Sequence, residues 1–393
     1  MHKIIFLFLI ISLPALAQNS LLSNLEAQME LSLKELNALG NTTGNKVNPR
    51  TVRNDSLILV APRDWCSGFY PGNLWFLYEL TGKEQWKKQA EYYTQKIEKE
   101  QFNRGTHDLG FKMLGSFGNG WRLKTNESAY RDILIQSAKT LSTRFNPKTG
   151  VIRSWDHSRD KWNNPVIIDN MMNLELLFWA FRQTKDSSFY RIAVSHANTT
   201  MKNHFRPDFS SYHVIDYDIN TGLVTKKNTH QGFSHESAWS RGQAWALYGY
   251  AVCYRETGDK KYLQQAENIA QFIFSHPRLP SDLIPYWDFD DPKIPNVPRD
   301  ASAAAVTASA LYQLVQQKSK HSKDYLQKAE KIIQSLSSPT YLASVGSNHG
   351  FLLKHSTGGL PNGFEIDAPI VYADYYFLEA LIYQKNIRKK LKK

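Results

Sequence analysis

The sequence predicts an all-α fold, an (α/α)6 barrel of six inner and six outer helices. Five segments repeat one pattern, in which a polar turn precedes an aromatic residue, an alanine and apolar residues at helical spacing. The stretches between them are rich in aromatic and small residues and poor in charge, which is typical of helices buried on all sides. Such alternation predicts two concentric rings. An open solenoid of helix pairs is the alternative, and a single cluster of reactive side chains favours the closed barrel.

The outer helices are predicted from their charged faces and from the Asp or Ser residues that precede them as caps. Together with a first amphipathic helix, the repeated segments place them at 21–38, 81–90, 126–138, 184–193, 257–266 and 321–329. The inner helices are predicted near 67–80, 108–118, 169–182, 236–255, 300–316 and 366–384.

One segment interrupts the helices and has the pattern of a β-hairpin. Residues 211–226 alternate around Val214 and Tyr217, and the sequence Asn220-Thr221-Gly222 predicts the turn. No stretch rich in Pro, Gly or Ser divides the chain. We therefore expect a single catalytic domain that covers residues 18–393.

The N-terminus has the pattern of a secretory signal peptide over residues 1–17. A short basic region precedes the apolar run 4–13, and Ala15-Leu16-Ala17 fits a small-residue cleavage site. We expect an exported protein, with the periplasm preferred over secretion, and no membrane span. Cys66 and Cys253 are the only cysteines. Export would permit a disulfide between them, but their positions in the sequence do not decide it.

The composition describes a basic, aromatic-rich chain of 393 residues with a formal net charge of +12. A basic surface attracts anionic partners. The Lys and Arg residues are spread through the helical segments, apart from a short tail at 387–393, so the pattern does not indicate a nucleic-acid partner. An acidic polysaccharide fragment is the expected partner. Trp65, Trp155 and Trp239 lie in polar surroundings, where they suit stacking on a ring-shaped ligand as well as packing in the core.

Polar residues gather at the predicted starts of the inner helices. They include Asp64, His107-Asp108, Asp169, the segment 231–241, Asp300, and Glu365 with Asp367. For each one alone, an N-terminal helix cap is the simpler interpretation. In a barrel, however, all six starts meet at one end, and such a set predicts a polar pocket lined by aromatic side chains.

The same residues exclude several kinds of chemistry. His235-Glu236 lacks the second histidine of a zinc helix, so we expect no metal. The sequence contains neither a phosphate loop nor a Gly-x-Ser-x-Gly elbow, and we expect no cofactor. The remaining chemistry is general acid/base catalysis by carboxylates.

Five motifs, in this order, resemble those of the unsaturated glucuronyl hydrolases, glycoside hydrolase family 88. The resemblance covers most of the mature chain, from about residue 65 to 381. The motifs are DWCSGFYPGNLWFLYELTG (64–82), HDLGF (107–111), IDNMMNLELL (168–177), HQGFSHESAWSRGQAWALYGY (230–250) and VYADYYFLEAL (371–381).

The resemblance implies an (α/α)6 barrel that removes the 4,5-unsaturated uronic acid left by polysaccharide lyases. Water adds across the vinyl ether double bond. Asp169 would be the general acid/base, and Asp108 the second carboxylate, which binds ring hydroxyls and tunes Asp169. Residues expected to bind the substrate are His107, Trp65, Trp155, His213, Gln231, Trp239, Arg241, Ser356 and Tyr372. Arg241 suits the uronate carboxylate, although a structural ion pair explains it equally well.

The resemblance also implies that the loop before the last inner helix can recognise sulfate. Here the loop spans 354–362 and offers Lys354, His355, Ser356 and Thr357, but Gly359, Leu360 and Pro361 stand where further donors would be wanted. Glycosaminoglycan disaccharides are the expected substrates, and sulfate tolerance is left open.

Three other functions are alternatives. An unsaturated rhamnogalacturonyl hydrolase uses the same barrel on pectin fragments, and the motifs at 107–111 and 168–177 argue against it. A sugar epimerase would be expected without an export signal. A non-catalytic binder of acidic oligosaccharides would also fit the basic charge and the aromatic residues.

Overall fold

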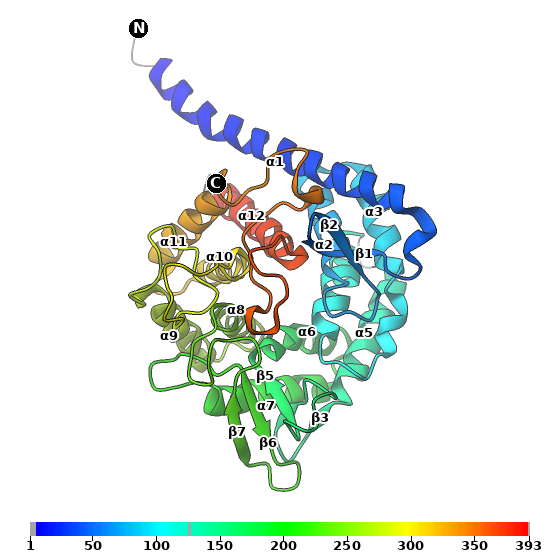
Figure 1. Cartoon of the computed structure of the whole chain (residues 1–393), viewed down its shortest axis with the longest axis vertical. Helices are drawn as coiled ribbons and strands as arrows, with labels where there is room; N and C mark the ends of the chain where they lie inside the picture. The colour runs from blue at the N-terminus through cyan, green and yellow to red at the C-terminus, as the bar shows by residue number, and fades with distance from the viewer. Residues whose placement is uncertain (1–4, 125–126, 392–393) are drawn as a thin grey trace.

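The computed structural model describes residues 5–124 and 127–391, and its helices form a closed ring (Figure 1). Residues 1–4 of the predicted signal peptide lie outside this range, and the rest of that peptide belongs to the first helix. The long helices are α1 (Ile5–Leu39), α2 (Phe69–Thr81), α3 (Glu84–Gln95), α5 (Ser128–Ser142), α6 (Leu174–Thr184), α7 (Ser187–Asn203), α8 (Ser240–Thr257), α9 (Lys260–Ser275), α10 (Ala301–Gln316), α11 (Ser322–Leu336) and α12 (Val371–Leu391).

The inner ring closes because each inner element packs against the next. Its order is α2, a π-helical segment at Gly110–Gly118, α6, α8, α10 and α12, and α12 returns to α2. The helices α3, α5, α7, α9 and α11 pack outside these elements, as the colours that run round the ring in Figure 1 show. The predicted (α/α)6 barrel is therefore confirmed.

The sixth outer helix, α1, lies along the barrel beside α2 and α3. Glu26 on α1 accepts a hydrogen bond from the Trp86 indole and pairs with Lys83. Ser32, further along α1, donates a hydrogen bond to the Tyr70 hydroxyl. These contacts attach the N-terminal helix to the first helix pair.

Helix caps explain where several helices begin. Asp186 and Asp259 accept backbone N–H bonds at the starts of α7 and α9, as the repeat pattern predicts. Asp300 does the same for α10, where an alanine-rich sequence lets the inner helices approach closely. The cap interpretation is therefore right for these three aspartates.

The predicted inner helices near 108–118, 169–182, 236–255 and 366–384 differ in their beginnings from the observed ones. The second is a π-helical segment that continues into the short helix α4 (Asn119–Leu123). The third opens with a 3-10 segment, Ile168–Asn173, before α6. The fourth and sixth start later than predicted, because the residues before them form loops that close one end of the barrel. The orange segment before α12 crosses the middle of the ring in Figure 1.

The predicted hairpin is confirmed as β6 (Val214–Tyr217) and β7 (Val224–Asn228), which pair antiparallel. The structure adds a third strand, β5 (Pro165–Ile167), paired with β6. It also contains two hairpins that the sequence pattern did not predict. They are β1 (Asn48–Arg53) with β2 (Ser56–Val60), and β3 (Phe145–Asn146) with β4 (Val151–Ile152).

The two cysteines are free thiols. Cys66 precedes α2 and Cys253 lies within α8, and both are fully buried. The structure therefore contains no disulfide between them, and a core of this size is stable without one.

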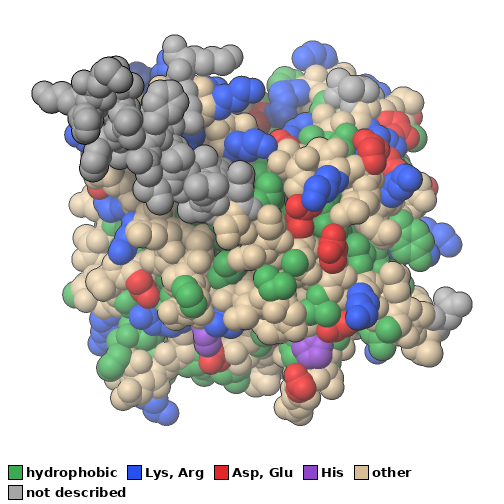
Figure 2. Space-filling view, turned by 90° about the horizontal axis from the view of Figure 1, so that it is seen from above, with side chains coloured by type: hydrophobic (Ala, Val, Ile, Leu, Met, Phe, Trp, Pro, Cys, Tyr) green, Lys and Arg blue, Asp and Glu red, His purple; other side chains and the backbone are tan. Residues whose placement is uncertain are grey.

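The surface carries charges of both signs. On the face drawn in Figure 2, Lys and Arg side chains are interspersed with Asp and Glu rather than gathered in one patch. Within the described residues, no helix combines the length and the apolar character that crossing a bilayer requires.

Candidate active site

A cavity of about 160 Å³ lies at the end of the barrel where the inner helices begin. Most of the predicted site residues line it, namely Trp65, His107, Asp108, Trp155, Asp169, Gln231, Arg241 and Tyr372. They come from five different inner elements or the loops before them. Four of the six predicted polar helix starts therefore supply residues to this cavity, and the other two, at Asp64 and Asp300, pair with the lining residues Arg50 and Arg241.

The β5–β6 pairing positions Asp169. Ile167 pairs with Val214, and the N–H of Ile168 donates to the carbonyl of His213. One residue after this bond, the chain turns into the 3-10 segment, which brings Asp169 to the cavity with His213 beside it. The distance from His213 Nε2 to Asp169 Oδ2 is 3.6 Å.

The Asp169 side chain is buried and does not cap a helix. Its Oδ2 atom is buried and has no hydrogen-bond partner among the described residues. Burial raises the pKa of Asp169 from 3.8 to about 7, and the negative charge of Asp108 acts in the same direction, whereas the positive charge of Arg241 opposes both. Asp169 is therefore a carboxyl group that can hold a proton near neutral pH and can also release it.

His213 is a neutral ring whose Nε2 atom faces Asp169 from just beyond hydrogen-bond distance. Its Nδ1 atom accepts the backbone N–H groups of His230 and Gln231, which places the ring proton on Nε2, the atom that faces Asp169. Burial holds the pKa of His213 well below its usual range, and the nearby His230 and Arg241 strengthen this effect. The imidazole thus presents a polar N–H to the Asp169 carboxyl without adding a charge.

Asp108 lies at the start of the second inner element. Thr106 donates to its Oδ2 atom at 2.6 Å, and His107 Nε2 lies 3.2 Å from Oδ1. The backbone that follows packs closely on the third element, because a Cβ at Gly110 would lie 2.6 Å from the Cα of Asn173. The N–H of Phe111 donates to the Asn173 side chain. This close approach brings the two catalytic candidates, Asp108 and Asp169, into one cavity.

Arg241 combines the two roles that the sequence left open. Its guanidinium pairs with Asp300 at 2.7 Å and donates to the carbonyls of Thr357 and Gly358, so it is a buried structural ion pair. It also lines the cavity and contributes to the electrostatics of Asp169. A guanidinium has five N–H groups, and two remain for a substrate carboxylate.

Aromatic rings supply part of the cavity lining. Trp65 packs on Tyr372 at 4.9 Å and on Phe111 at 5.4 Å between ring centroids. Trp155 also lines the cavity and stacks with His157. Trp65 and Trp155 are partly exposed, and they offer surfaces on which a flat sugar ring can stack.

Three expected substrate-binding residues, Trp239, Ser356 and His213, do not line the cavity. Trp239 is buried behind the cavity, with its ring 4.7 Å from that of His213 and beneath the Arg241 guanidinium at 4.4 Å. Ser356 is fully buried, because its backbone pairs with Ala368. We therefore correct all three expectations: Trp239 supports its neighbours, Ser356 holds the loop before α12 in place, and His213 acts through Asp169.

The loop at 354–362 directs its sulfate-binding candidates away from the cavity. Lys354 donates to the carbonyl of Pro339, His355 pairs with Asp367, and Thr357 donates to the carbonyl of Arg299. Only its glycine backbone, at Gly358, reaches the cavity.

The cavity also contains residues that were not predicted as site residues. They are Arg50, His157, Ile167, His230, Gly358, Phe364 and Glu365. Glu365 belongs to the polar set before the sixth inner helix, so its position was a usable signal. Arg50 lies in the unpredicted β1–β2 hairpin, whose Asn54-Asp55 turn between apolar residues would have revealed it.

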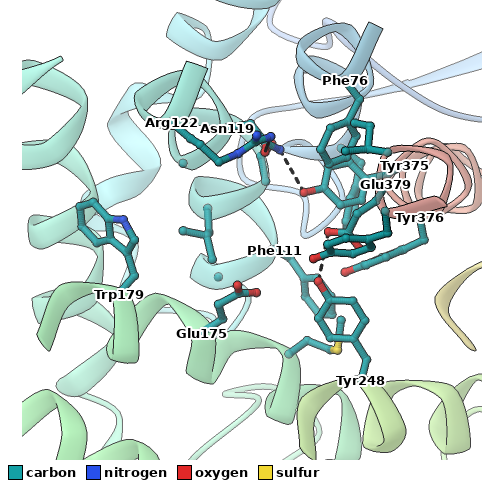
Figure 3. Close-up of a pocket in the computed structure, with 18 of the residues that line it drawn as sticks. Phe76, Phe111, Asn119, Arg122, Glu175, Trp179, Tyr248, Tyr375, Tyr376 and Glu379 are labelled. Carbon is teal, nitrogen blue, oxygen red and sulfur yellow. Dashed lines mark hydrogen bonds between the residues drawn. The ribbon is translucent and has the colours of Figure 1, made fainter. Parts of the chain in front are cut away.

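A second and larger cavity, of about 360 Å³, lies at the opposite end of the barrel (Figure 3). Phe69 and Phe111 line it and pack against Trp65, so an aromatic layer separates the two cavities. Its buried carboxyl group, Glu379, accepts hydrogen bonds from Tyr248 and Ser309. Its Arg side chains pair with Glu side chains, as Arg122 does with Glu79. These charged side chains already bind one another or fixed hydroxyl groups, as is typical of a structural network.

No metal-binding cluster occurs in the part of the chain that the structure describes: no three His, Cys, Asp or Glu side chains converge on a common point.

Comparisons with known proteins agree with this fold. The sequence profile of Glycosyl Hydrolase Family 88 matches residues 45–379. An unsaturated glucuronyl hydrolase of Formosa agariphila is 52% identical over 84% of this chain and 82% of its own. An unsaturated chondroitin disaccharide hydrolase of Streptococcus pneumoniae is 30% identical over 81% of both chains. The crystal structure of an unsaturated glucuronyl hydrolase specific for heparin superposes with a TM-score of 0.87, 48% identity, and coverage of 93% of this chain and 98% of that one. The chain is a glycoside hydrolase, and it belongs to glycoside hydrolase family 88.

Proposed function

We propose that this enzyme removes the 4,5-unsaturated uronic acid from the non-reducing end of oligosaccharides that polysaccharide lyases release. The observation that carries the proposal is Asp169, a buried carboxyl group with a pKa of about 7 and an unpaired Oδ2 atom at a cavity that also contains Arg241. A proton donor beside a fixed cation suits a substrate that carries both a reactive double bond and a carboxylate.

The reaction begins with the protonated form of Asp169. Asp169 donates its proton to C4 of the unsaturated ring, and the positive charge that develops at C5 is shared with the ring oxygen. The Asp169 carboxylate then accepts a proton from the water that attacks C5. The product is a hemiketal, which opens and releases the next sugar. Asp169 ends protonated again, so the cycle needs no other proton source.

The other side chains hold the ring in this orientation. The two unpaired N–H groups of Arg241 receive the uronate carboxylate. Gln231 lies beside it, with its amide fixed by the carbonyl of Gly358. Asp108 accepts hydrogen bonds from ring hydroxyls, and its charge raises the pKa of Asp169. Trp65 and Trp155 stack on the ring.

Disaccharides from glycosaminoglycans are the substrates that we propose. The cavity of about 160 Å³ is small for a ligand site, so it would hold the terminal ring and leave the second sugar at the rim. The named relatives act on unsaturated chondroitin disaccharides or are specific for heparin, and both groups of substrate carry the same terminal ring.

The test is an activity screen on defined unsaturated disaccharides from chondroitin, hyaluronan, heparin and rhamnogalacturonan. Loss of the ultraviolet absorbance of the double bond reports turnover. We expect activity on the glycosaminoglycan products. Turnover of the rhamnose-containing fragments alone would reject this substrate class, and absence of turnover on every unsaturated substrate would reject the reaction.

We further propose that the protein is exported after cleavage behind Ala17, and that it works in the periplasm. The support is the basic, apolar and small-residue pattern of residues 1–17. N-terminal sequencing of protein recovered from the periplasmic fraction should begin at Gln18. An intact Met1 on cytoplasmic protein would contradict this proposal.

A further inference from the structure

Arg50 reaches the cavity from outside the barrel because of an irregularity in the β1–β2 hairpin. Asn48 and Pro49 pair with Val60 and Leu59, and Thr51 pairs with Ile58, so Arg50 has no partner across the hairpin. Such a bulge turns a side chain out of the regular alternation, and bulges occur often beside active sites. The Thr51 hydroxyl donates to the carbonyl of Pro369, which fastens the hairpin to the loop before α12.

Glu365 lies opposite Arg50 in this loop. Its backbone is left-handed, with φ of 51°, a conformation that costs energy for a residue with a side chain and often occurs at functional sites. Glycine at position 358 makes room for it, because a Cβ there would lie 2.1 Å from Glu365 Oε2. The carbonyl of the same glycine accepts hydrogen bonds from Arg241 and Gln231. Gly358 therefore lies between Glu365 and the two side chains, Arg241 and Gln231, that we place beside the uronate carboxylate.

The charges on this wall of the cavity do not cancel. Arg50 donates from Nε to Glu365 Oε1 and from Nη1 to Asp64 Oδ2, at 2.5 and 2.9 Å. One cation therefore faces two carboxylates. The second oxygen of Asp64, Oδ1, accepts the N–H and the thiol of Cys66. In the described part of the chain, Glu365 Oε2 makes no such bond, and Glu365 lines the cavity.

We propose that Glu365, held by Arg50, is a specificity-determining residue. Its Oε2 accepts a hydrogen bond from a sugar hydroxyl and excludes an O-sulfate at that position. An ionised carboxylate is an acceptor only, and it repels a second anion in a water-poor cavity. Arg50 is the positioning residue that holds the carboxylate in this orientation. The inference rests on the proposed function for the identity of the substrate.

The matched variants are Glu365→Gln and, as a control, Asp367→Asn. Asp367 has the same φ of 51° two residues later, but it pairs with the partly exposed His355 and does not line the cavity. The substrates are an unsulfated unsaturated disaccharide and the same disaccharide with one O-sulfate at each hydroxyl in turn. The wild type should prefer the unsulfated substrate over at least one sulfated form. Glu365→Gln should reduce this ratio of kcat/KM about tenfold, and the control should keep it.

Arg50→Gln provides a test of opposite sign. Glutamine keeps a hydrogen-bond donor for Glu365 but leaves the negative wall without its cation, so discrimination against the sulfated form should widen at least threefold. If Glu365→Gln and Arg50→Gln each change kcat/KM by the same factor for every disaccharide, the ion pair is structural and the inference is wrong.

Binding separates this inference from the proposed function. Calorimetry of the same disaccharides with Asp169→Asn, alone and combined with Glu365→Gln, measures discrimination without turnover. Failure of wild-type turnover would reject the reaction, whereas equal affinities for sulfated and unsulfated ligands in Asp169→Asn would reject the role of Glu365.

Discussion

The two ends of the barrel each contain a buried carboxyl group with a pKa of about 7, and the two groups differ in their partners. Asp169 lies where the inner helices begin, and Glu379 lies in the cavity at their other end. Burial is the main cause of the raised pKa in both cases. Both oxygens of Glu379 accept hydroxyl groups, from Tyr248 and Ser309, whereas Asp169 keeps Oδ2 unpaired.

This difference shows that a perturbed pKa alone does not identify an active site. A carboxyl group whose hydrogen bonds are satisfied by fixed neighbours has no free atom for a substrate. The smaller cavity is the better candidate for the active site because Asp169 keeps one unpaired oxygen there and lies beside a guanidinium that keeps free donors. The Arg and Glu side chains around the larger cavity pair with one another, or, as Glu379 does, accept hydroxyl hydrogen bonds.

The largest expected effect is the difference in activity between the variants of the two carboxyl groups. Asp169→Asn should lower kcat/KM by about 10³–10⁴-fold, because the only proton donor is lost while the shape of the side chain is kept. Glu379→Gln should stay within about threefold of the wild type. Steady-state rates and circular dichroism on both proteins check this, and similar losses in the two variants would place the chemistry elsewhere.

The second effect concerns stability. The pKa of Glu379 is raised from 4.5 to about 7 on folding, so its stabilisation is complete below pH 4.5 and is lost as the pH rises to about 7. Between pH 5 and pH 8, the wild type should lose about 2.5 kcal/mol more free energy of unfolding than Glu379→Gln, by order of magnitude. Urea denaturation at the two pH values measures the difference, and parallel losses would show that Glu379 titrates normally.

The third effect concerns the pH profile. Asp169 must be protonated to start the reaction, so kcat/KM should fall about tenfold per unit above pH 7. His213→Asn keeps an acceptor for the backbone N–H groups of His230 and Gln231 but loses the donor that faces Asp169. The charged form of Asp169 is then less stable, its pKa rises, and the alkaline limb should move to higher pH with a roughly tenfold lower rate. If the alkaline limb of the profile does not move, it belongs to a titrating group other than Asp169.

The smallest effect tests the satisfied network at the far end. Tyr248→Phe removes one hydrogen bond to Glu379 and should reduce the free energy of unfolding by about 1 kcal/mol. Activity should be unchanged, since an aromatic layer lies between the two cavities. Thermal denaturation and kinetics on the same preparation check both statements, and a large loss of activity would show that the two ends are coupled.

The pattern of outer and inner helices was readable because it is local. Periodicity and caps such as Asp186 and Asp259 depend on residues within a few positions of each other. Site residues on inner helix starts, including Asp108, Asp169 and Arg241, were predicted from short motifs for the same reason. Trp239 and Ser356 were misplaced, because the sequence around a residue does not show which face of a loop the barrel will cover.

By itself, the sequence determined the (α/α)6 barrel, the hairpin at 211–226 and the carboxylates that meet at one end. Only the tertiary structure decided which polar helix start is a cap and which is a proton donor. Asp300 accepts the first N–H groups of α10 and pairs with Arg241, whereas Asp169 follows a strand and its Oδ2 atom has no hydrogen-bond partner in the described part of the chain. The reason is physical: a pKa depends on burial and on charges brought close by folding, and residues distant in the sequence supply both.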